Sequence, residues 1–168
     1  VVGGVRAHPP KVEKIISEKI NKKERRLATA SALAATCIKE LVMARNNLSN
    51  AIEVPIIIEN SFENLKKAKE VENALNSLNI LSEVEKAKDK KRIRAGKGKT
   101  RGRKYKRKKS LLIVVKDKSN VIKAARNLEG LDITTAKEIN AKLLAPGTRA
   151  GRLTVFTEKA IEEFANWK

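Results

Sequence analysis

Leu111-Leu112-Ile113-Val114-Val115 is the strongest strand signal in this chain of 168 residues. Its consecutive branched aliphatic residues predict a strand that is buried on both faces, since a half-exposed strand alternates apolar with polar residues. Such strands are typical of mainly parallel sheets covered by helices. The stretch therefore predicts an α/β fold, and the chain length fits a single domain.

Weaker signals on both sides of this stretch predict the other elements. Further strands are expected at Val54–Glu59, Leu131–Thr134 and Leu153–Phe156. Capping residues and helical apolar spacing predict helices at 11–46 in two pieces, 60–78, a short one from 82, 119–128, 135–145 and 157–167. The alternation of strands with helices favours a mainly parallel sheet.

The core of this domain is expected to be aliphatic. Apolar residues make up 41% of the chain but aromatic residues only 3%, so Leu, Ile, Val and Ala must fill the interior. In the first helical region, Leu27, Ser31, Ala34, Ile38 and Leu41 recur at helical spacing. Because the run Leu27–Ala44 is dense in Ala, we expect a long helix with small residues that can lie close against a sheet or another backbone.

The composition excludes several classes of protein. A single cysteine, Cys37, rules out an internal disulfide, and with a single histidine, His8, it also rules out an ordinary His/Cys zinc site. The same shortage leaves no Ser-His-Asp or Cys-His catalytic set. No apolar run approaches the roughly 18–20 residues that cross a bilayer, and no signal peptide is found. We therefore expect no enzyme activity, metal, cofactor, small-molecule substrate or membrane.

An intensely basic segment, Lys88–Lys109, lies in the middle of the chain. It carries fourteen Lys or Arg residues and one acid, Asp89, and so supplies +13 of the formal net charge of +19. Because like charges repel and little in it is apolar, we expect this segment not to fold on itself and to need a dense polyanion. A solvated loop or a targeting signal is the alternative, but this charge density with interleaved glycines favours nucleic acid.

The candidate nucleic-acid contacts are the basic side chains of this segment, its single aromatic residue, and three weaker clusters outside it. Glycines such as Gly96, Gly98 and Gly102 let a backbone approach phosphates closely, and Tyr105 could stack on a base. The predicted contacts are Arg6, His8, Arg25, Arg26, Arg92, Arg94, Lys97, Lys99, Arg101, Arg103, Lys104, Tyr105, Lys106, Arg107, Lys108, Lys109, Arg149 and Arg152.

Gly98-Lys99-Thr100 has the ending of a phosphate-binding loop of the Walker type. That motif requires a further glycine five positions earlier, where this chain has Ile93, and it requires a strand before and a helix after the loop. The flanks here are polybasic instead. A nucleotide-binding loop is therefore rejected.

Three stretches, in this order and spacing, resemble the ribosomal protein L four family of the large subunit in its archaeal and eukaryotic form. They are GGVRAHPP (3–10) followed by EKINKKERRLATASALAAT (18–36), RIRAGKGKTRGRKYKRKKSLLIVV (92–115), and LLAPGTRAGRLTVFTEKAI (143–161). The resemblance covers almost the whole chain. Family members begin with a strand, a helix and the outgoing arm of a long loop, which are not found here, so we expect this chain to correspond to the C-terminal part.

The resemblance implies a three-layer α/β/α domain with a small, mostly parallel sheet and extended basic segments that bind RNA. Residues 1–10 would be the returning arm of the loop that reaches the peptide exit tunnel, and residues 11–168 a single globular domain with a basic insertion at 88–109. The implied function is structural: binding large-subunit ribosomal RNA beside neighbouring ribosomal proteins, in the cytoplasm, without catalysis. A free-standing RNA- or DNA-binding regulator built on the same domain is the alternative.

Overall fold

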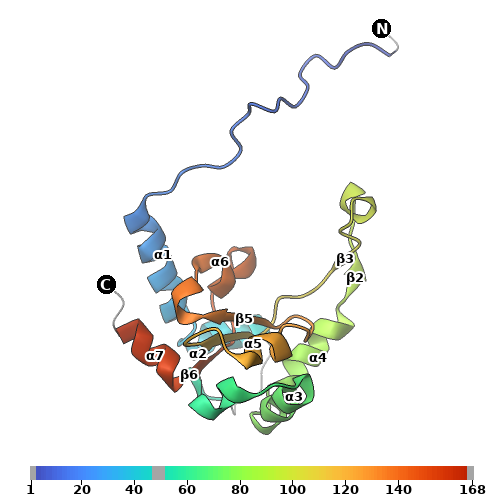
Figure 1. Ribbon diagram of the computed structural model, residues 1–168. Helices are drawn as coiled ribbons and strands as arrows, with labels where there is room; N and C mark the ends of the chain where they lie inside the picture. Colours follow the sequence, from blue (N-terminus) through green and yellow to red (C-terminus); the bar gives the residue numbers. More distant parts are fainter. Residues whose placement is uncertain (1–2, 47–51, 166–168) are drawn as a thin grey trace.

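A four-stranded parallel sheet lies at the centre of the computed structural model (Figure 1), with the strand order β1-β6-β4-β5. The structure describes residues 3–46 and 52–165. The strands are β1 (Ile56–Ile58), β4 (Leu112–Val115), β5 (Asp132–Thr135) and β6 (Thr154–Thr157). In register, Ile113 of β4 is the partner of Ile133 of β5 and of Val155 of β6. The parallel sheet predicted from the apolar runs is confirmed.

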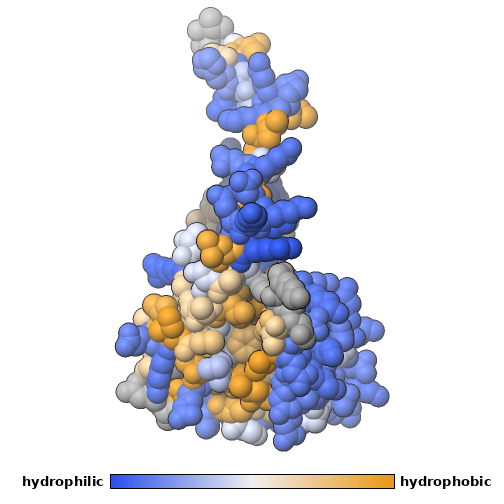
Figure 2. Space-filling view, turned by 90° about the vertical axis from the view of Figure 1, so that its left-hand side faces the viewer, coloured by the Kyte–Doolittle hydropathy of each residue, from blue (hydrophilic) through white to orange (hydrophobic). Residues whose placement is uncertain are grey.

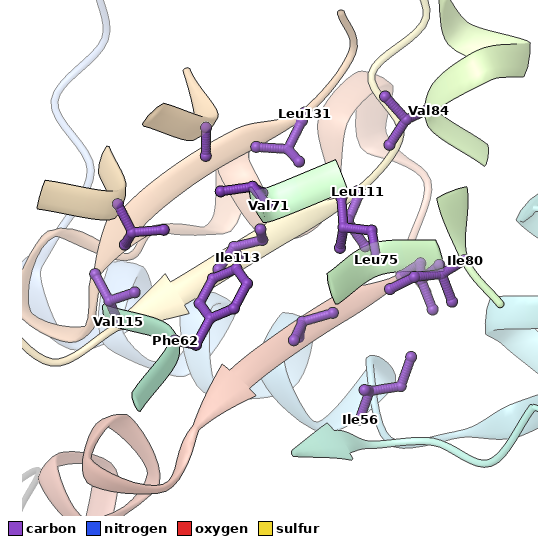
Figure 3. Packing of buried hydrophobic residues seen from close by; sticks show 14 of the residues in the cluster. Ile56, Phe62, Val71, Leu75, Ile80, Val84, Leu111, Ile113, Val115 and Leu131 are labelled. Carbon is purple, nitrogen blue, oxygen red and sulfur yellow. The ribbon is translucent and has the colours of Figure 1, made fainter. Parts of the chain in front are cut away.

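Helices cover both faces of this sheet. Leu111, Ile113 and Val115 point to one face, where they pack against α3 (Ala68–Ser77), α4 (Leu81–Asp89) and α5 (Asn120–Ala125), as Figure 3 shows. Leu112 and Val114 point to the other face, against α1 (Lys22–Ala35), α6 (Ala141–Leu144) and α7 (Glu158–Ala165). All residues of β4 are buried, so the predicted double burial of this strand and the three-layer α/β/α class are both confirmed.

Residues 11–20 differ from the helix expected there. They form an exposed, irregular segment that leads away from the domain (Figure 1), and the first helices are α1 and α2 (Lys39–Asn46). Val12, Ile15 and Ile16 are almost fully exposed. A short helix is marginal in water unless its apolar face packs against something, and this segment packs against nothing in the described residues.

Two other predicted helices are broken, and a third begins one residue before its predicted cap. The helix expected at 60–78 is a 3₁₀ turn, Asn60–Asn64, followed by an extended Leu65 and then α3. The helix expected at 135–145 divides at the extended residue Ile139 into a 3₁₀ turn, Ala136–Glu138, and α6. The helix from 82 starts at Leu81, which puts Ser82 inside the helix and not at its cap. A single sequence with apolar residues at helical spacing does not reveal that one residue within the pattern is extended, and so these breaks could not be predicted.

The helix expected to follow the last strand is α7, which starts at Glu158 directly after β6. Trp167, its predicted end, lies outside the described residues, as do Val1 and Val2 of the N-terminal segment.

The helix with small residues, α1, does lie close to the sheet, but the apolar stripe at helical spacing is not the face that it buries. Leu27 is 72% exposed and Ile38 47%, whereas Thr29 and Ala35 are the buried residues of α1. Figure 2 shows hydrophobic side chains gathered on the face of the domain that carries α1 and α7. Ala32 and Leu33, which lie between Ser31 and Ala34 of the stripe, pack against the core on that side of the sheet instead.

No single helix in the described part of the chain is long and apolar enough to cross a membrane. Only α1 and α2 taken together reach that length, and they are bent by 81° relative to each other.

The loop before β6 approaches α2 so closely that only glycine fits at Gly151. Its φ is +76°, and a Cβ atom there would lie 2.5 Å from the carbonyl oxygen of Leu41. We expect Gly151→Ala to lower the free energy of unfolding by about 2–4 kcal/mol, from backbone strain and overpacking. Gly147→Ala is the control, since φ is +74° there with open space around it. Urea denaturation checks this, and equal losses in the two variants would contradict it.

Candidate nucleic-acid interface

The centre of the basic segment folds into a two-stranded antiparallel ribbon. β2 (Arg92–Ile93) pairs with β3 (Tyr105–Lys106), and a 3₁₀ turn, Lys97–Thr100, lies between them. We call residues 92–106 the basic ribbon. It projects away from the domain (Figure 1), so its side chains are open to a large partner. The expectation that this segment would not fold on itself is wrong.

Hydrogen bonds to backbone carbonyls explain how so many cations fold together. The Arg94 backbone N–H donates to the Lys104 carbonyl at 2.8 Å. Its Nε donates to the Arg103 carbonyl at 3.1 Å, and Nη2 donates to the Tyr105 carbonyl at 3.4 Å. The ammonium groups of Lys91 and Lys104 lie 5.0 Å and 5.5 Å from the centre of the Tyr105 ring. Arg94 therefore holds the ribbon together.

The two faces of the ribbon differ in chemistry. Arg92 and Lys106 are directly opposed across the strands, and so are Ile93 and Tyr105. Opposed residues share one face, so the first pair forms a cationic face and the second an apolar and aromatic one. Like charges that face each other destabilise a ribbon, and an anion bound between them removes that cost. A hollow of about 450 Å³ lies beside this pair and is lined by Asp89, Lys90, Lys91, Arg92, Lys106, Arg107 and Lys108.

The last three cations of the basic segment are already paired with acids of the domain. Arg107 lies 3.4 Å from Glu129, Lys108 lies 2.9 Å from Glu83, and Lys109 lies 2.6 Å from Asp132. These residues join the ribbon to the sheet. The open cations of the ribbon and its turn are all exposed: Arg92, Lys97, Lys99, Arg101, Arg103, Lys104 and Lys106.

Arg152 requires a correction, because a solvated loop arginine facing RNA was expected there. Its side chain is completely buried. Nε donates to the Ser110 carbonyl at 2.7 Å, Nη1 to the Leu143 carbonyl at 2.8 Å, and Nη2 to the Leu111 carbonyl at 2.9 Å. Nη2 also lies 2.7 Å from Asp132 Oδ2. Burial lowers the pKa of Arg152, although the Asp132 carboxylate opposes that shift. Arg152 is a core residue that joins β4, β5 and α6.

Arg149, the other predicted residue of that loop, is exposed. Its carbonyl accepts a hydrogen bond from Arg45, whose Nη2 also donates to the Pro146 carbonyl at 3.1 Å. Burial and the charges of Arg152 and Arg149 lower the pKa of Arg45. Arg45 was not among the predicted residues, because nothing in the helical sequence around it signals a contact about a hundred residues away.

The remaining predicted contacts lie on the N-terminal segment and the start of α1. Arg6, His8, Arg25 and Arg26 are all exposed, and Arg6 and His8 line a shallow hollow with Lys11 and Lys14. The N-terminal segment and the basic ribbon both leave the domain on the same side, upward in Figure 1. The structure thus places two separate groups of predicted contacts on one side of the domain.

The ion pairs that Glu83 and Asp132 form with Lys and Arg residues predict that the folded domain loses stability in acid. Burial alone would raise the pKa of Glu83, but hydrogen bonds from Lys86 and Lys108 outweigh it and hold that pKa below its usual range. Burial alone would also raise the pKa of Asp132. Hydrogen bonds from Lys109 and Arg152 outweigh this effect and hold that pKa below its usual range.

Because both folded pKa values lie below the unfolded ones, the stabilisation is complete above about pH 5 and is lost as pH falls through the folded values. We expect a constant melting temperature between about pH 7 and 5 and a steep fall below about pH 4. Thermal unfolding followed by circular dichroism checks this. Glu83→Gln should fall less steeply than the wild type, and an identical profile would contradict the assignment.

The comparisons with known proteins point in one direction. The sequence profile of the ribosomal protein L4/L1 family matches residues 1–167. The large ribosomal subunit protein uL4 of Methanocaldococcus jannaschii is 55% identical over 96% of this chain, and this chain covers 64% of it. The uL4 of Archaeoglobus fulgidus is 48% identical over 99% of the chain and is covered to 66%. That of Methanococcoides burtonii is 54% identical over 95% and is covered to 63%. The chain thus spans slightly less than two thirds of these relatives.

Proposed function

The chain belongs to the ribosomal protein L4/L1 family, and from that premise we propose that it is a structural component of the large ribosomal subunit that binds and stabilises large-subunit ribosomal RNA. Its place is then in the cytoplasm, within the subunit and beside other ribosomal proteins. Its role is non-catalytic. The observation that carries the proposal is the basic ribbon, a dense set of open cations on an arm that projects from the domain.

The ribbon suits a folded RNA because its exposed side chains are mostly cations, which pair with phosphates. Lys97, Lys99, Arg101, Arg103, Lys104 and Lys106 are the proposed phosphate contacts, with Arg92 beside them and Tyr105 for stacking on a base or sugar. Phosphate contacts position a protein without reading sequence, so specificity comes from the shape of the RNA.

The N-terminal segment supplies the second group of contacts. Arg6, His8, Arg25 and Arg26 are proposed to lie on RNA too, with residues 1–10 as part of the family's long loop toward the exit tunnel. Arg149 is retained as an exposed contact at the loop before β6. Arg152 is not proposed, because its guanidinium is buried. Arg94, Arg107, Lys108 and Lys109 act mainly by holding the ribbon in place.

Sedimentation tests this function against the alternative of a free-standing regulator. Tagged protein expressed in an archaeal host should co-sediment with large subunits and stay bound through a high-salt wash. A control uses the same tag on a variant with Arg101, Arg103, Lys104 and Lys106 changed to glutamine, which should be depleted from that fraction. A wild-type pool found mainly off the ribosome would overturn the proposal and favour the regulator.

A further inference from the structure

Three carboxylates surround the base of the basic ribbon: Glu83 on α4, Glu129 in the loop before β5, and Asp132 at the start of β5. We call them the acidic collar. They are unexpected in this place, because negative charges beside an RNA-binding arm oppose the attraction of phosphates. Glu83 is also completely buried, a costly position for a carboxylate.

Each carboxylate of the collar bridges two cations. Glu83 lies 2.9 Å from Lys108 and 2.8 Å from Lys86 of its own helix. Glu129 lies 3.4 Å from Arg107 and 3.4 Å from Lys91. One cation of each bridge belongs to the consecutive residues 107–109, where the chain leaves the ribbon and enters the sheet.

The second cation of each bridge shows what this exit segment, residues 107–109, is tied to. Asp132 joins Lys109, at 2.6 Å, to the buried Arg152, at 2.7 Å, and so to the core. Glu129 joins the exit segment to Lys91, which directly precedes the ribbon, and Glu83 joins it to α4. Ser110 adds a hydrogen bond from its hydroxyl to the Glu83 carbonyl at 3.1 Å. The exit segment is therefore tied to the core, to the residue that enters the ribbon and to a helix at once.

The ribbon needs such ties because it is too small to fix its own direction. Its strands are two residues each, and an isolated two-stranded ribbon is marginal in water. An arm that swings freely must lose that freedom when it binds, and the loss weakens binding.

We propose that Glu83, Glu129 and Asp132 are positioning residues for RNA binding, which hold Arg107, Lys108 and Lys109 to the domain and so fix the direction in which the basic ribbon presents its open cations. This inference rests on the proposed RNA-binding function. It has an unusual consequence: removing negative charge from this protein should weaken its binding to a polyanion.

The test is the affinity of the purified chain for large-subunit ribosomal RNA, measured by filter binding for Glu83→Gln, Glu129→Gln and Asp132→Asn. The matched control is Glu85→Gln, an exposed residue of α4, for which no partner on the ribbon is found. All four variants gain one positive charge. We expect each collar variant to bind about 3- to 10-fold more weakly than the wild type, as ordering long side chains on binding costs affinity. Glu85→Gln should bind as tightly or slightly more tightly.

Two further measurements separate positioning from folding. The ¹H–¹⁵N heteronuclear NOE of Gly98 and Gly102 should fall in the collar variants, while the amides of β4 keep their wild-type values. Glu83→Asp retains a carboxylate, which the flexible side chain of Lys108 can still reach. This variant should therefore recover part of the affinity that Glu83→Gln loses. If Glu83→Gln unfolds, the affinity and NOE values of Glu129→Gln test the inference. Glu129 reaches the surface of the domain, with its side chain 22% exposed.

Collar variants that bind as tightly as Glu85→Gln, with unchanged NOE values in the ribbon, would overturn the inference and leave the proposed function intact. A wild-type chain that does not bind large-subunit RNA would instead overturn the proposed function.

Discussion

Replacing Arg152 with leucine is expected to lower the free energy of unfolding by about 3–5 kcal/mol, the range for removing one partner of a buried ion pair. The substitution removes the guanidinium donors from the carbonyls of Ser110 and Leu143. It leaves the Leu111 carbonyl with the Asp132 backbone N–H as its remaining donor. It also leaves Asp132 with Lys109 as its cationic partner and without the buried guanidinium. The result should be a domain that is barely stable or unfolded.

Urea denaturation of the two variants Arg152→Leu and Arg149→Ala tests this directly. Arg149 lies three residues earlier in the same loop but is exposed, so its loss should change stability by no more than about 0.5 kcal/mol. Arg152→Lys should fall between them, because one ammonium cannot reproduce four hydrogen bonds in a planar arrangement. A loss below about 1 kcal/mol in Arg152→Leu would contradict the structural role assigned to the buried guanidinium.

Neutralising the outer part of the basic ribbon is expected to have the largest effect on binding. The variant changes four exposed cations to glutamine: Arg101, Arg103, Lys104 and Lys106. Each lost phosphate contact reduces the slope of log K against log salt by about 0.7–0.9, so four contacts reduce it by about three and the affinity by about 100-fold or more. Arg107 is left in place because it pairs with Glu129.

The control is a second variant with the same change in net charge, elsewhere on the domain. It replaces the exposed residues Lys69, Arg126, Lys142 and Lys159 with glutamine. Its salt slope should stay within about one unit of the wild type, since no phosphate contacts are proposed there. Equal losses of slope in the two variants would show that overall charge, and not the ribbon, determines binding.

The sheet could be predicted from sequence because its strands are local apolar runs. Leu111–Val115 needs burial on both faces whatever surrounds it, and the observed β4 is buried throughout. The face that α1 buries could not be predicted, because small residues occur on several sides of that helix. Ala32 packs against the core, whereas Ala34 is exposed. Local composition predicts that a helix has a buried face, but the elements packed against the helix determine which face that is.

The roles of single arginines were less predictable. Arg152 follows Gly151 in a polar loop, the sequence context of a solvated residue. Its burial depends on Asp132, twenty residues earlier, and on the Ser110 carbonyl, forty-two residues earlier. The basic segment was found from its charge, but its fold depends on Arg94 bonding backbone carbonyls across the ribbon. The net charge of such a segment indicates a polyanionic partner, but it gives no information on how the segment folds.

Competition binding tests the central claim, that this domain binds folded large-subunit RNA through the basic ribbon. Purified chain is bound to labelled large-subunit RNA and displaced with unlabelled large-subunit or small-subunit RNA, at several salt concentrations. Large-subunit RNA should compete at least about tenfold better, and this preference should disappear in the variant of Arg101, Arg103, Lys104 and Lys106. Equal competition by both RNAs, or a preference that survives in that variant, would contradict the account.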